Sequence, residues 1–464
     1  MWCALLMGSG TARGAAIYEA GVTVDLSTLT VEARFTAPVP RVLEAQDPSA
    51  GKYLEGLRVS GARSRLPAAG AGRIALGPSG DSLVVNYTVD LRAIERAGRF
   101  RRTGSARTHA VLSNPQLWLW LPPSGESQAI KLRFRLPDGM SVSGPWPQGT
   151  DSDGFPVFDV GELSQDWPAL VAIGRFEVRP VEVPGAQLRL AVLDGNPAPD
   201  QAAIRDWIAG GAAAVAGAYG AFPLNAPQIL VVPLGRGDEP VPWGQVLRGG
   251  GAAAHLFIDQ TRPAAELRND WVLVHELSHM LHPNLDGKGP WLAEGMATYY
   301  QNVLRARAGM LTGAQAWQKL HEGFQRGIAG TQAGVTLDEA TRNMMENHLF
   351  MRVYWSGAAM VLLADLQLRR RGQSLDRVLS RFRDCCLDQP RVWLVAEYLG
   401  TLDRLAEAPV FMPLYRRYAD SDQFPDLSAA YAELGLGVRG GKVVPGVDAE
   451  AAALRQAIMG DSAD

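Results

Sequence analysis

Hydrophobic and polar residues alternate along several short stretches of the first 180 positions. Such alternation places one face of a strand in a core and the other face in solvent. The stretches are Val22–Leu26, Leu29–Phe35, Leu83–Val89 and Lys131–Leu136, with turn residues such as Gly77–Gly80 between them. This pattern predicts an antiparallel β-sandwich or saddle over residues 17–180.

The pattern changes after about residue 180. Strands are expected at Leu188–Leu193, Gln228–Val232 and His255–Ile258, and an Ala-rich helix at about 200–218 follows the first of them. From Glu266 onward, hydrophobic residues recur at helical spacing almost to the end of the chain.

These expectations describe an α+β multidomain protein. A second domain of mixed sheet and helices, with a helical C-terminal part, is expected over residues 181–436. A tail over 437–464 follows and begins inside a glycine-rich break at 435–445. A short helix is expected in this tail at about 448–458.

The helix expected after residue 270 has an unusual polar face. Asn269 and Asp270 are typical of a helix start, Pro283 ends the segment, and the buried stripe is Leu273, Leu277 and Leu281. His275 and His279 are also four residues apart, so both imidazoles lie on one side of the helix. This is the H-E-x-x-H arrangement, in which two histidines bind zinc and the intervening Glu276 faces the water that the metal activates.

Catalytic zinc takes three protein ligands, and the next helix offers a third. Glu294 lies in Trp291–Tyr300, after a connection rich in Pro and Gly. An antiparallel return would bring Glu294 beside His275 and His279, so we predict one zinc ion per chain held by these three residues. The alternative is an ordinary carboxylate at a helix start.

His282 is a third histidine in the same segment, seven residues after His275. Seven residues correspond to about 10.5 Å along a helix, too far for a third ligand of one tetrahedral site. We interpret His282 as a cation at the helix C-terminus, stabilised by the helix dipole.

H-E-x-x-H followed by W-L-x-E-G resembles the gluzincins, the zinc peptidases with Glu as third ligand. Three further stretches are similar to the glycyl aminopeptidase family and, more distantly, the aminopeptidase N family: Tyr219–Leu224 with the strand Ile229–Pro233, Arg248–Ala254 with the strand after it, and Tyr354–Gly357. Phe411–Tyr418 and Ala430–Leu436 also look like the glycyl aminopeptidase type.

The resemblance implies a thermolysin-like catalytic domain that hydrolyses peptides. Glu276 would be its general base, and Tyr354 would carry the catalytic hydroxyl. Gly249, Gly250, Gly251 and Ala252 would bind substrate, because Arg248–Ala254 and the following strand stand where the family has its substrate-binding edge strand. From the residues alone, Tyr354 could also be a core aromatic and the glycines a plain turn.

The sequence also departs from these families. The edge-strand motif of aminopeptidase N carries a Glu that grips the substrate's free amine, and Arg248–His255 contains no carboxylate. An aminopeptidase and an endopeptidase of narrow preference therefore both remain open. The residues after Leu436 are too few for the PDZ domain common among glycyl aminopeptidases.

Composition narrows the classes of protein. The 464 residues are 47% hydrophobic, which argues against a disordered chain. The chain has 45 Lys plus Arg and 48 Asp plus Glu, and this lack of a basic excess argues against a nucleic-acid binder. No apolar run is long enough to cross a membrane. The expected partner is a peptide or protein substrate, and the oligomeric state is left open.

Adjacent Cys385 and Cys386 are interpreted as small buried hydrophobes.

The first residues resemble a secretory leader. Met1–Met7 is apolar and small residues ending at Gly14–Ala16 follow, although the basic start is missing. We expect residues 1–16 to be a signal-peptide remnant and the protein to be exported, to the periplasm or the medium; without a leader it would be cytoplasmic. Two other readings are an inactive peptidase-fold scaffold and a β-sandwich adhesion or carbohydrate-binding module.

Overall fold

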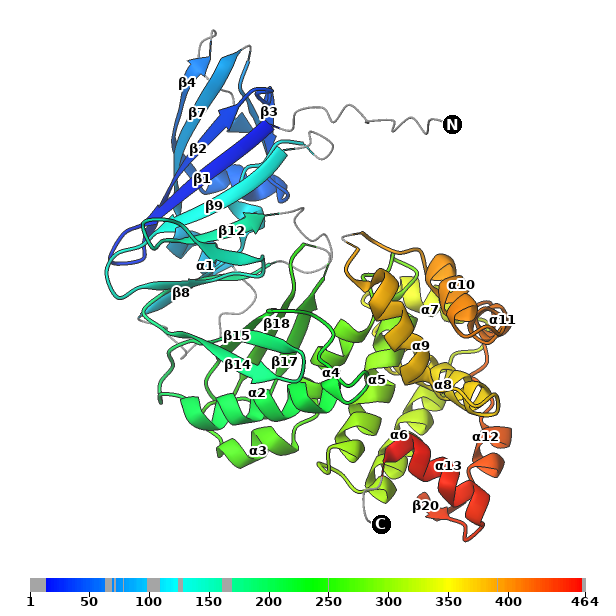
Figure 1. The fold of residues 1–464 in the computed structure, drawn as a ribbon. Helices are drawn as coiled ribbons and strands as arrows, with labels where there is room; N and C mark the ends of the chain where they lie inside the picture. Colours follow the sequence, from blue (N-terminus) through cyan, green and yellow to red (C-terminus); the bar gives the residue numbers. More distant parts are fainter. Residues whose placement is uncertain are drawn as a thin grey trace, which may run out of the picture.

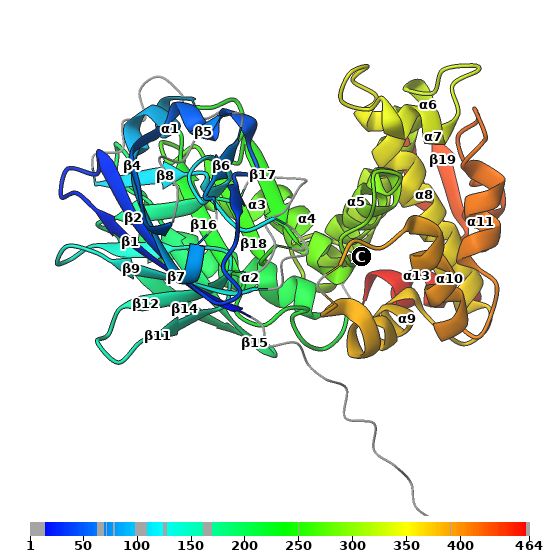
Figure 2. The same cartoon turned by 90° about the horizontal axis from the view of Figure 1, so that it is seen from above.

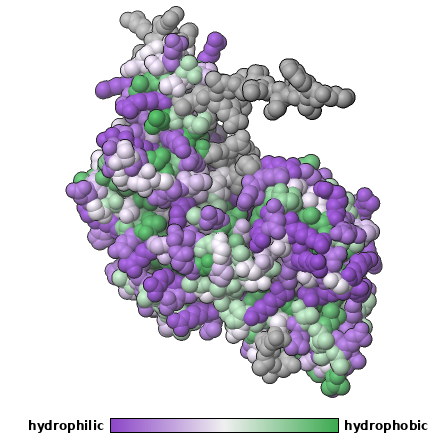
Figure 3. Space-filling model, in the orientation of Figure 1, coloured by the Kyte–Doolittle hydropathy of each residue, from purple (hydrophilic) through white to green (hydrophobic). Residues whose placement is uncertain are grey.

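The computed structural model describes residues 14–62, 69–70, 72–77, 79–97, 109–123, 128–160, 169–248, 250–389 and 391–460. The fold is α+β. A β-rich part built from the first 180 residues lies beside a second part in which a smaller sheet is followed by helices (Figure 1). Seen from above, the strands of both parts lie on one side of the molecule and the later helices form a lobe on the other side (Figure 2). Hydrophilic residues cover most of the helical part on the face drawn in Figure 3, with apolar residues scattered among them.

The largest sheet of the N-terminal part has seven strands in the order β11-β12-β9-β1-β2-β7-β4. Its strands are β1 (Gly14–Val22), β2 (Thr28–Thr36), β4 (Leu54–Ala62), β7 (Ser79–Asp90), β9 (Gln128–Arg135), β11 (Gln148–Thr150) and β12 (Pro156–Val160). The strands predicted at Leu29–Phe35, Leu83–Val89 and Lys131–Leu136 lie in β2, β7 and β9, although β9 ends at Arg135. The pair β1–β9 is parallel, so the expectation of a purely antiparallel sheet is wrong at this pair.

Two three-stranded sheets complete the N-terminal part, together with the short helix α1 (Leu91–Ala97). They contain β10 (Ser141–Ser143), β13 (Val171–Gly174) and β8 (Ala110–Ser113), and β3 (Val42–Glu44), β6 (Arg73–Ala75) and β5 (Ala69–Gly70). The core between the sheets is aromatic. Tyr18, Trp118 and Trp120 are fully buried, and the Tyr18 hydroxyl donates to the Trp120 carbonyl at 2.6 Å.

The first strand differs from its prediction at both ends. The strand expected at Val22–Leu26 is wrong, because β1 ends at Val22 and the chain turns there, with the Ser27 N–H donating to Asp25 Oδ1 at 3.2 Å. At the other end, residues 14–16 were expected to be the end of the leader, but they belong to β1, where Ala16 is fully buried. Residues 1–13 lie outside the described part, so the leader itself stays a prediction.

The second part begins with a five-stranded sheet in the order β14-β15-β16-β18-β17. Its strands are β14 (Val178–Val183), β15 (Ala186–Val192), β16 (Gln228–Pro233), β17 (Trp243–Leu247) and β18 (Ala253–Ile258). β14 starts before residue 181, so the change between the two parts falls a few residues earlier than expected. β17 pairs antiparallel with β18 and forms one edge of the sheet.

The helices pack on this sheet and on one another around one large hydrophobic core. They are α2 (Gln201–Ala216), α3 (Ala264–Asn269), α4 (Val272–Ser278), α5 (Pro290–Arg307), α6 (Gly313–Ala329), α7 (Leu337–Arg342), α8 (Phe350–Arg369), α9 (Leu375–Phe382), α10 (Val395–Leu405), α11 (Phe411–Tyr418), α12 (Ser428–Glu433) and α13 (Ala449–Met459). Within the described residues, no helix has the length and apolar character needed to span a membrane.

The C-terminal segment packs on the helices. The hairpin β19 (Leu436–Arg439) and β20 (Lys442–Pro445) precedes α13, and the Arg307 Nε donates to the Ile458 carbonyl at 2.8 Å. The interpretation of Cys385 and Cys386 as buried hydrophobes is wrong. The two residues are joined by a disulfide on the turn after α9, and neither is buried.

Candidate metal centre

The helix α4 starts where the sequence indicated and ends earlier. The Val272 N–H donates to Asp270 Oδ1 at 2.7 Å, which satisfies a free N–H of the first turn. The stripe Leu273, Leu277 and Leu281 is buried as expected. The α-helix ends at Ser278, and His279–Leu281 continue as a 3-10 turn, because the chain tightens before Pro283.

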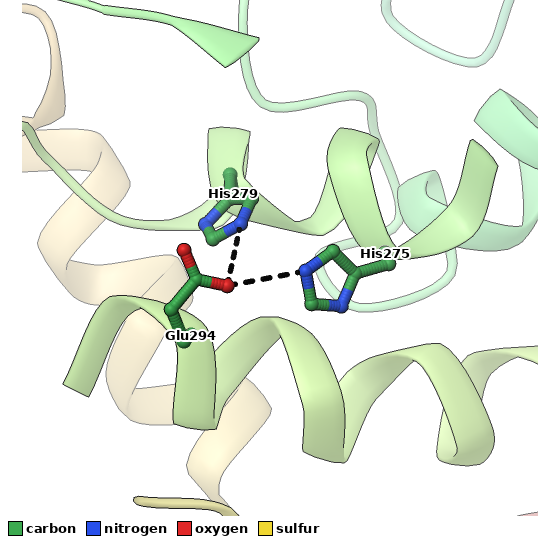
Figure 4. A group of neighbouring side chains, drawn as sticks. All are labelled: His275, His279 and Glu294. Atoms are coloured by element: carbon green, nitrogen blue, oxygen red, sulfur yellow. Dashed lines mark hydrogen bonds and ion pairs between the residues drawn. The ribbon is translucent and has the colours of Figure 1, made fainter. Parts of the chain in front are cut away.

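Three side chains converge between α4 and α5 (Figure 4). The Nε2 atoms of His275 and His279 lie 3.2 Å and 3.4 Å from Glu294 Oε2. All three possible ligand atoms lie within 4.8 Å of one another. Ligands around a tetrahedral zinc ion, at about 2.0–2.2 Å from the metal, are separated by about 3.3 Å. The group therefore fits a zinc ion in donor type, in number and in spacing.

The other ring nitrogen of each histidine is occupied, which directs Nε2 towards Glu294. His275 Nδ1 lies 2.8 Å from Gln301 Oε1, and His279 Nδ1 lies 3.3 Å from His282 Nε2. His282 Nδ1 lies 2.9 Å from the Pro283 carbonyl oxygen, so this nitrogen donates and the neutral ring accepts at Nε2. The chain of hydrogen bonds thereby places the proton of His279 on Nδ1 and leaves its Nε2 for a metal.

The interpretation of His282 as a charged helix terminus is wrong. The residue is fully buried, and burial, together with the nearby Arg248, holds the pKa of its imidazole well below the usual range. Arg248 Nη1 lies 3.4 Å from His282 Nε2 and also donates to the His279 carbonyl at 2.7 Å. His282 is thus neutral and serves as a hydrogen-bond acceptor behind the candidate ligand His279.

Tyr354 reaches the metal centre because α5 and α8 touch at two glycines. A Cβ atom added at Gly295 would lie 2.4 Å from the Gly357 carbonyl carbon, and one at Gly357 would lie 1.9 Å from the Trp291 carbonyl oxygen. Only glycine permits this approach. The Tyr354 ring then stacks on His275 with centroids 6.1 Å apart. Burial, the negative charges of Glu294 and Glu276, and a hydrogen bond with Glu294 raise the pKa of Tyr354, which keeps its hydroxyl protonated.

Glu276 lies beside the three candidate ligands in a cavity of about 300 Å³ that Trp243, Gly244, Arg248 and Tyr354 also line. Its side chain is nearly buried, and this burial raises the pKa of Glu276 to about 7. A carboxyl group with such a pKa, facing a cavity beside a metal site, is suited to proton transfer near neutral pH.

The placement of the predicted glycine-rich substrate strand is wrong. The strand after Gly249–Ala252 is β18, which pairs with β16 on one side and β17 on the other, so it offers no free edge to a peptide. The Ala252 N–H donates to the Pro145 carbonyl at 3.0 Å, and a Cβ at Gly251 would meet the same carbonyl, so Gly251 and Ala252 pack against the N-terminal part. Gly250 is buried and Gly249 lies outside the described residues. The prediction that these four residues bind substrate thereby loses the strand pairing on which it rested.

Sequence reasoning missed several residues of the site. Gln301 had a detectable signal, because it follows Glu294 by seven residues, two turns along the same face of α5. Gly244 and Arg248 had none, since the edge-strand position of β17 depends on the pairing of the whole sheet.

Comparisons with known proteins agree with this geometry. Residues 272–355 match the model of the M61 glycyl aminopeptidase family. No curated protein matches the chain. An aminopeptidase N family protein from Idiomarina loihiensis is similar in structure, with a TM-score of 0.70, 13% identity, and coverage of 91% of this chain and 79% of the other.

The M1 zinc metallopeptidase from Deinococcus radiodurans is also similar, with a TM-score of 0.55, 16% identity, and coverage of 90% and 96%. A variant of that enzyme bound to a Tyr-Ser-Ala substrate has a TM-score of 0.54 and 16% identity, covering 89% and 95%. These likenesses show a shared fold. The segment with the candidate site therefore resembles a family of peptide hydrolases. The chain as a whole has a fold similar to that of the M1 zinc metallopeptidases.

Proposed function

We propose that this protein is a zinc-dependent peptidase in which Glu276 is the general base. The observation that carries the proposal is the position of the Glu276 carboxylate, in the same cavity as His275, His279 and Glu294. An incidental cluster of buried polar residues would not need an additional carboxylate aimed into an accessible cavity beside it.

Zinc bound by His275, His279 and Glu294 would supply Lewis-acid activation of a water molecule. Glu276 would take a proton from the water molecule that attacks the peptide carbonyl carbon. The protonated Glu276 then gives the proton to the leaving amine nitrogen, so the carboxylate is restored at the end of the cycle.

Tyr354 is proposed to stabilise the developing oxyanion. Its hydroxyl is kept protonated near Glu294 and Glu276, and its ring is fixed against His275, so the hydroxyl can donate a hydrogen bond without reorganisation. The contact between Gly295 and Gly357 holds α8 close enough for this role.

The proposed peptide substrate lies along β17, which has one partner strand among the described residues and lines the zinc cavity. Main-chain hydrogen bonds to an edge strand bind a peptide without regard to most side chains. Glu239 and Asp270 also line the cavity and are the carboxylates available to a free amine, which supports an aminopeptidase mode. Internal cleavage by the same residues is the alternative mode.

Three further features belong to the proposal. The part beginning at β14 is a thermolysin-like catalytic domain, one zinc ion binds per chain, and the protein is exported if residues 1–13 form a leader. The fold of the M1 neighbours, the site geometry and the apolar first residues support them in turn.

The test is to incubate the zinc-loaded protein with a diverse peptide library and to sequence the products by mass spectrometry. Glu276→Gln runs beside it and should keep zinc while losing turnover. Products shortened by one N-terminal residue would establish an aminopeptidase, and internal cuts an endopeptidase. Cleavage that persists in Glu276→Gln would rule out Glu276 as the base.

A further inference from the structure

A second cavity, of about 380 Å³, adjoins the zinc cavity. The two cavities share the side chains of Trp271 and Tyr354, which stand between them. Neither Glu276 nor any of the three metal ligands lines the second cavity. Its chemistry is therefore distinct from that of the metal centre, although a molecule bound at the metal can extend into it.

One face of α5 connects the metal centre to this cavity. Thr298, Gln301, Asn302 and Arg305 line the cavity and are buried, and their spacing places them on the same helix face as Glu294. Eleven residues separate Glu294 from Arg305, which corresponds to about 16 Å along the helix. An extended peptide covers that length with about four or five residues.

The lining of the cavity is cationic. Arg305, Lys319 and Arg326 contribute positive charge, and Glu322 at the rim is the one carboxylate among the lining residues. Lys319, Glu322 and Arg326 are exposed on α6, and the Arg326 guanidinium stacks over Trp355 at 5.1 Å. The rim of the cavity therefore carries a guanidinium that stacks on Trp355 and an exposed ammonium group.

Arg305 forms the charged floor of the cavity and is only 3% exposed. Its Nη2 donates to the Asn269 carbonyl at 2.7 Å, and burial lowers the pKa of its guanidinium while the nearby Asp270 carboxyl opposes that shift. Its buried Nε has no hydrogen-bond partner among the described residues. This Nε has no surface open to the cavity, so a bound molecule would meet another part of the Arg305 side chain, and a carboxylate is the group that a cation lining a cavity attracts most strongly.

We propose that this cavity is a substrate subsite that binds a negatively charged group of the peptide, within about four or five residues of the cleaved bond. The group is a carboxylate, supplied by an acidic side chain or by the C-terminus of a short peptide. The inference rests on the proposed peptidase function and adds a substrate class to it.

The experiment uses the zinc-loaded enzyme and peptides that differ only in one residue, Gln or Glu, moved stepwise along the sequence. Each peptide is made with a free and with an amidated C-terminus, so that the arms separate an acidic side chain from a terminal carboxylate. Mass spectrometry gives kcat/KM and the cleaved bond, and calorimetry with zinc-loaded Glu276→Gln measures binding without turnover.

We expect one placement of the charge to raise kcat/KM about tenfold over the neutral peptide, as a charge-assisted hydrogen bond would. Lys319→Glu combined with Arg326→Glu should abolish or invert this preference, and Arg305→Gln should weaken it. Arg416→Gln, an exposed cation on α11, is the matched control and should keep the preference. Because Arg305 is buried, the exposed α6 variants keep the test valid if Arg305→Gln fails to fold.

Cleavage of acidic and neutral peptides at equal rates would overturn the subsite and leave the peptidase standing. A preference for acidic peptides that the α6 charge reversals do not change would also overturn it. If no peptide is cleaved and none binds to Glu276→Gln, the proposed function fails, and this inference fails with it.

Discussion

Gly244 of the edge strand β17 lies directly against Glu276 of α4. A Cβ atom added at Gly244 would sit 2.5 Å from Glu276 Cγ and 2.7 Å from Glu276 Oε1. The strand backbone and the carboxylate are therefore in contact, and no other side chain fits between them. The proposed general base and the proposed substrate strand are positioned by the same contact.

Gly244→Ala should displace the Glu276 carboxylate without removing a metal ligand. We expect kcat/KM to fall by about a hundredfold, as small misplacements of catalytic groups do, while the zinc content is unchanged. Gly287→Ala is the control, since a Cβ there meets nothing within 4 Å. Full activity of zinc-loaded Gly244→Ala would show that the contact does not position the base.

His282→Leu should weaken zinc binding, because His279 Nδ1 would lose the acceptor that fixes its ring. The expected loss of affinity is about 10- to 100-fold, measured by competition with a chelator of known affinity. His282→Gln should recover part of it, since the amide oxygen can accept the same hydrogen bond. His321→Leu, which changes a buried histidine bonded to Tyr431, should leave zinc affinity unaltered. Equal affinities in all four proteins would contradict this positioning role.

Tyr354→Phe should lower kcat by about a hundred- to a thousandfold with little change in zinc content, because it removes one proposed hydrogen-bond donor to the oxyanion. Steady-state kinetics on a peptide found by the library experiment give the value. An increase in KM with kcat unchanged would mean that Tyr354 binds substrate and does not stabilise the oxyanion.

Gly357→Ala should destabilise the folded protein by about 1–3 kcal/mol or more, since the added methyl would overlap the Trp291 carbonyl and push α8 from α5. Urea unfolding measures the change. Gly400→Ala in α10 is the matched control, because a Cβ there meets nothing within 4 Å and alanine favours a helix. If both variants are equally stable, the helix contact is looser than described.

Asp270→Asn should change how stability depends on pH. Burial raises the pKa of Asp270 to about 6, with Glu239 raising it further and Val272 N–H and Arg305 opposing. The folded state therefore holds this proton more tightly than the unfolded chain, whose value is near 3.8. The stability that the bound proton of Asp270 contributes is therefore fully present below pH 3.8, and it is lost as the pH rises through about 6.

Asn keeps the helix cap but does not titrate, so the stability of Asp270→Asn relative to the native protein should increase from pH 4 to pH 6 and stay level above. The increase should reach up to about 3 kcal/mol. Urea unfolding at a series of pH values measures it. A difference that is the same at pH 4 and pH 7 would mean that the Asp270 pKa is not raised.

Local sequence indicated most of the elements and the three candidate ligands. The four-residue spacing of His275 and His279 beside a leucine stripe places both imidazoles on one side, because helix geometry repeats every 3.6 residues. Strands such as Leu29–Phe35 and Gln228–Val232 were readable for the same reason, since alternation or an apolar run already specifies which residues are buried.

Tertiary structure decided which elements that are distant in the sequence lie in contact. The identity of the edge strand follows from the order β14-β15-β16-β18-β17, which local patterns do not encode, and so the glycine-rich stretch was assigned wrongly and Gly244 was missed. His282 looked like a helix-end cation until the 3-10 turn buried it behind His279. The cationic cavity joins residues of α5, α6 and α8, and only the packing of those helices brings their charges together. A helix or strand is set by neighbours in the chain, whereas a site is set by contacts between elements.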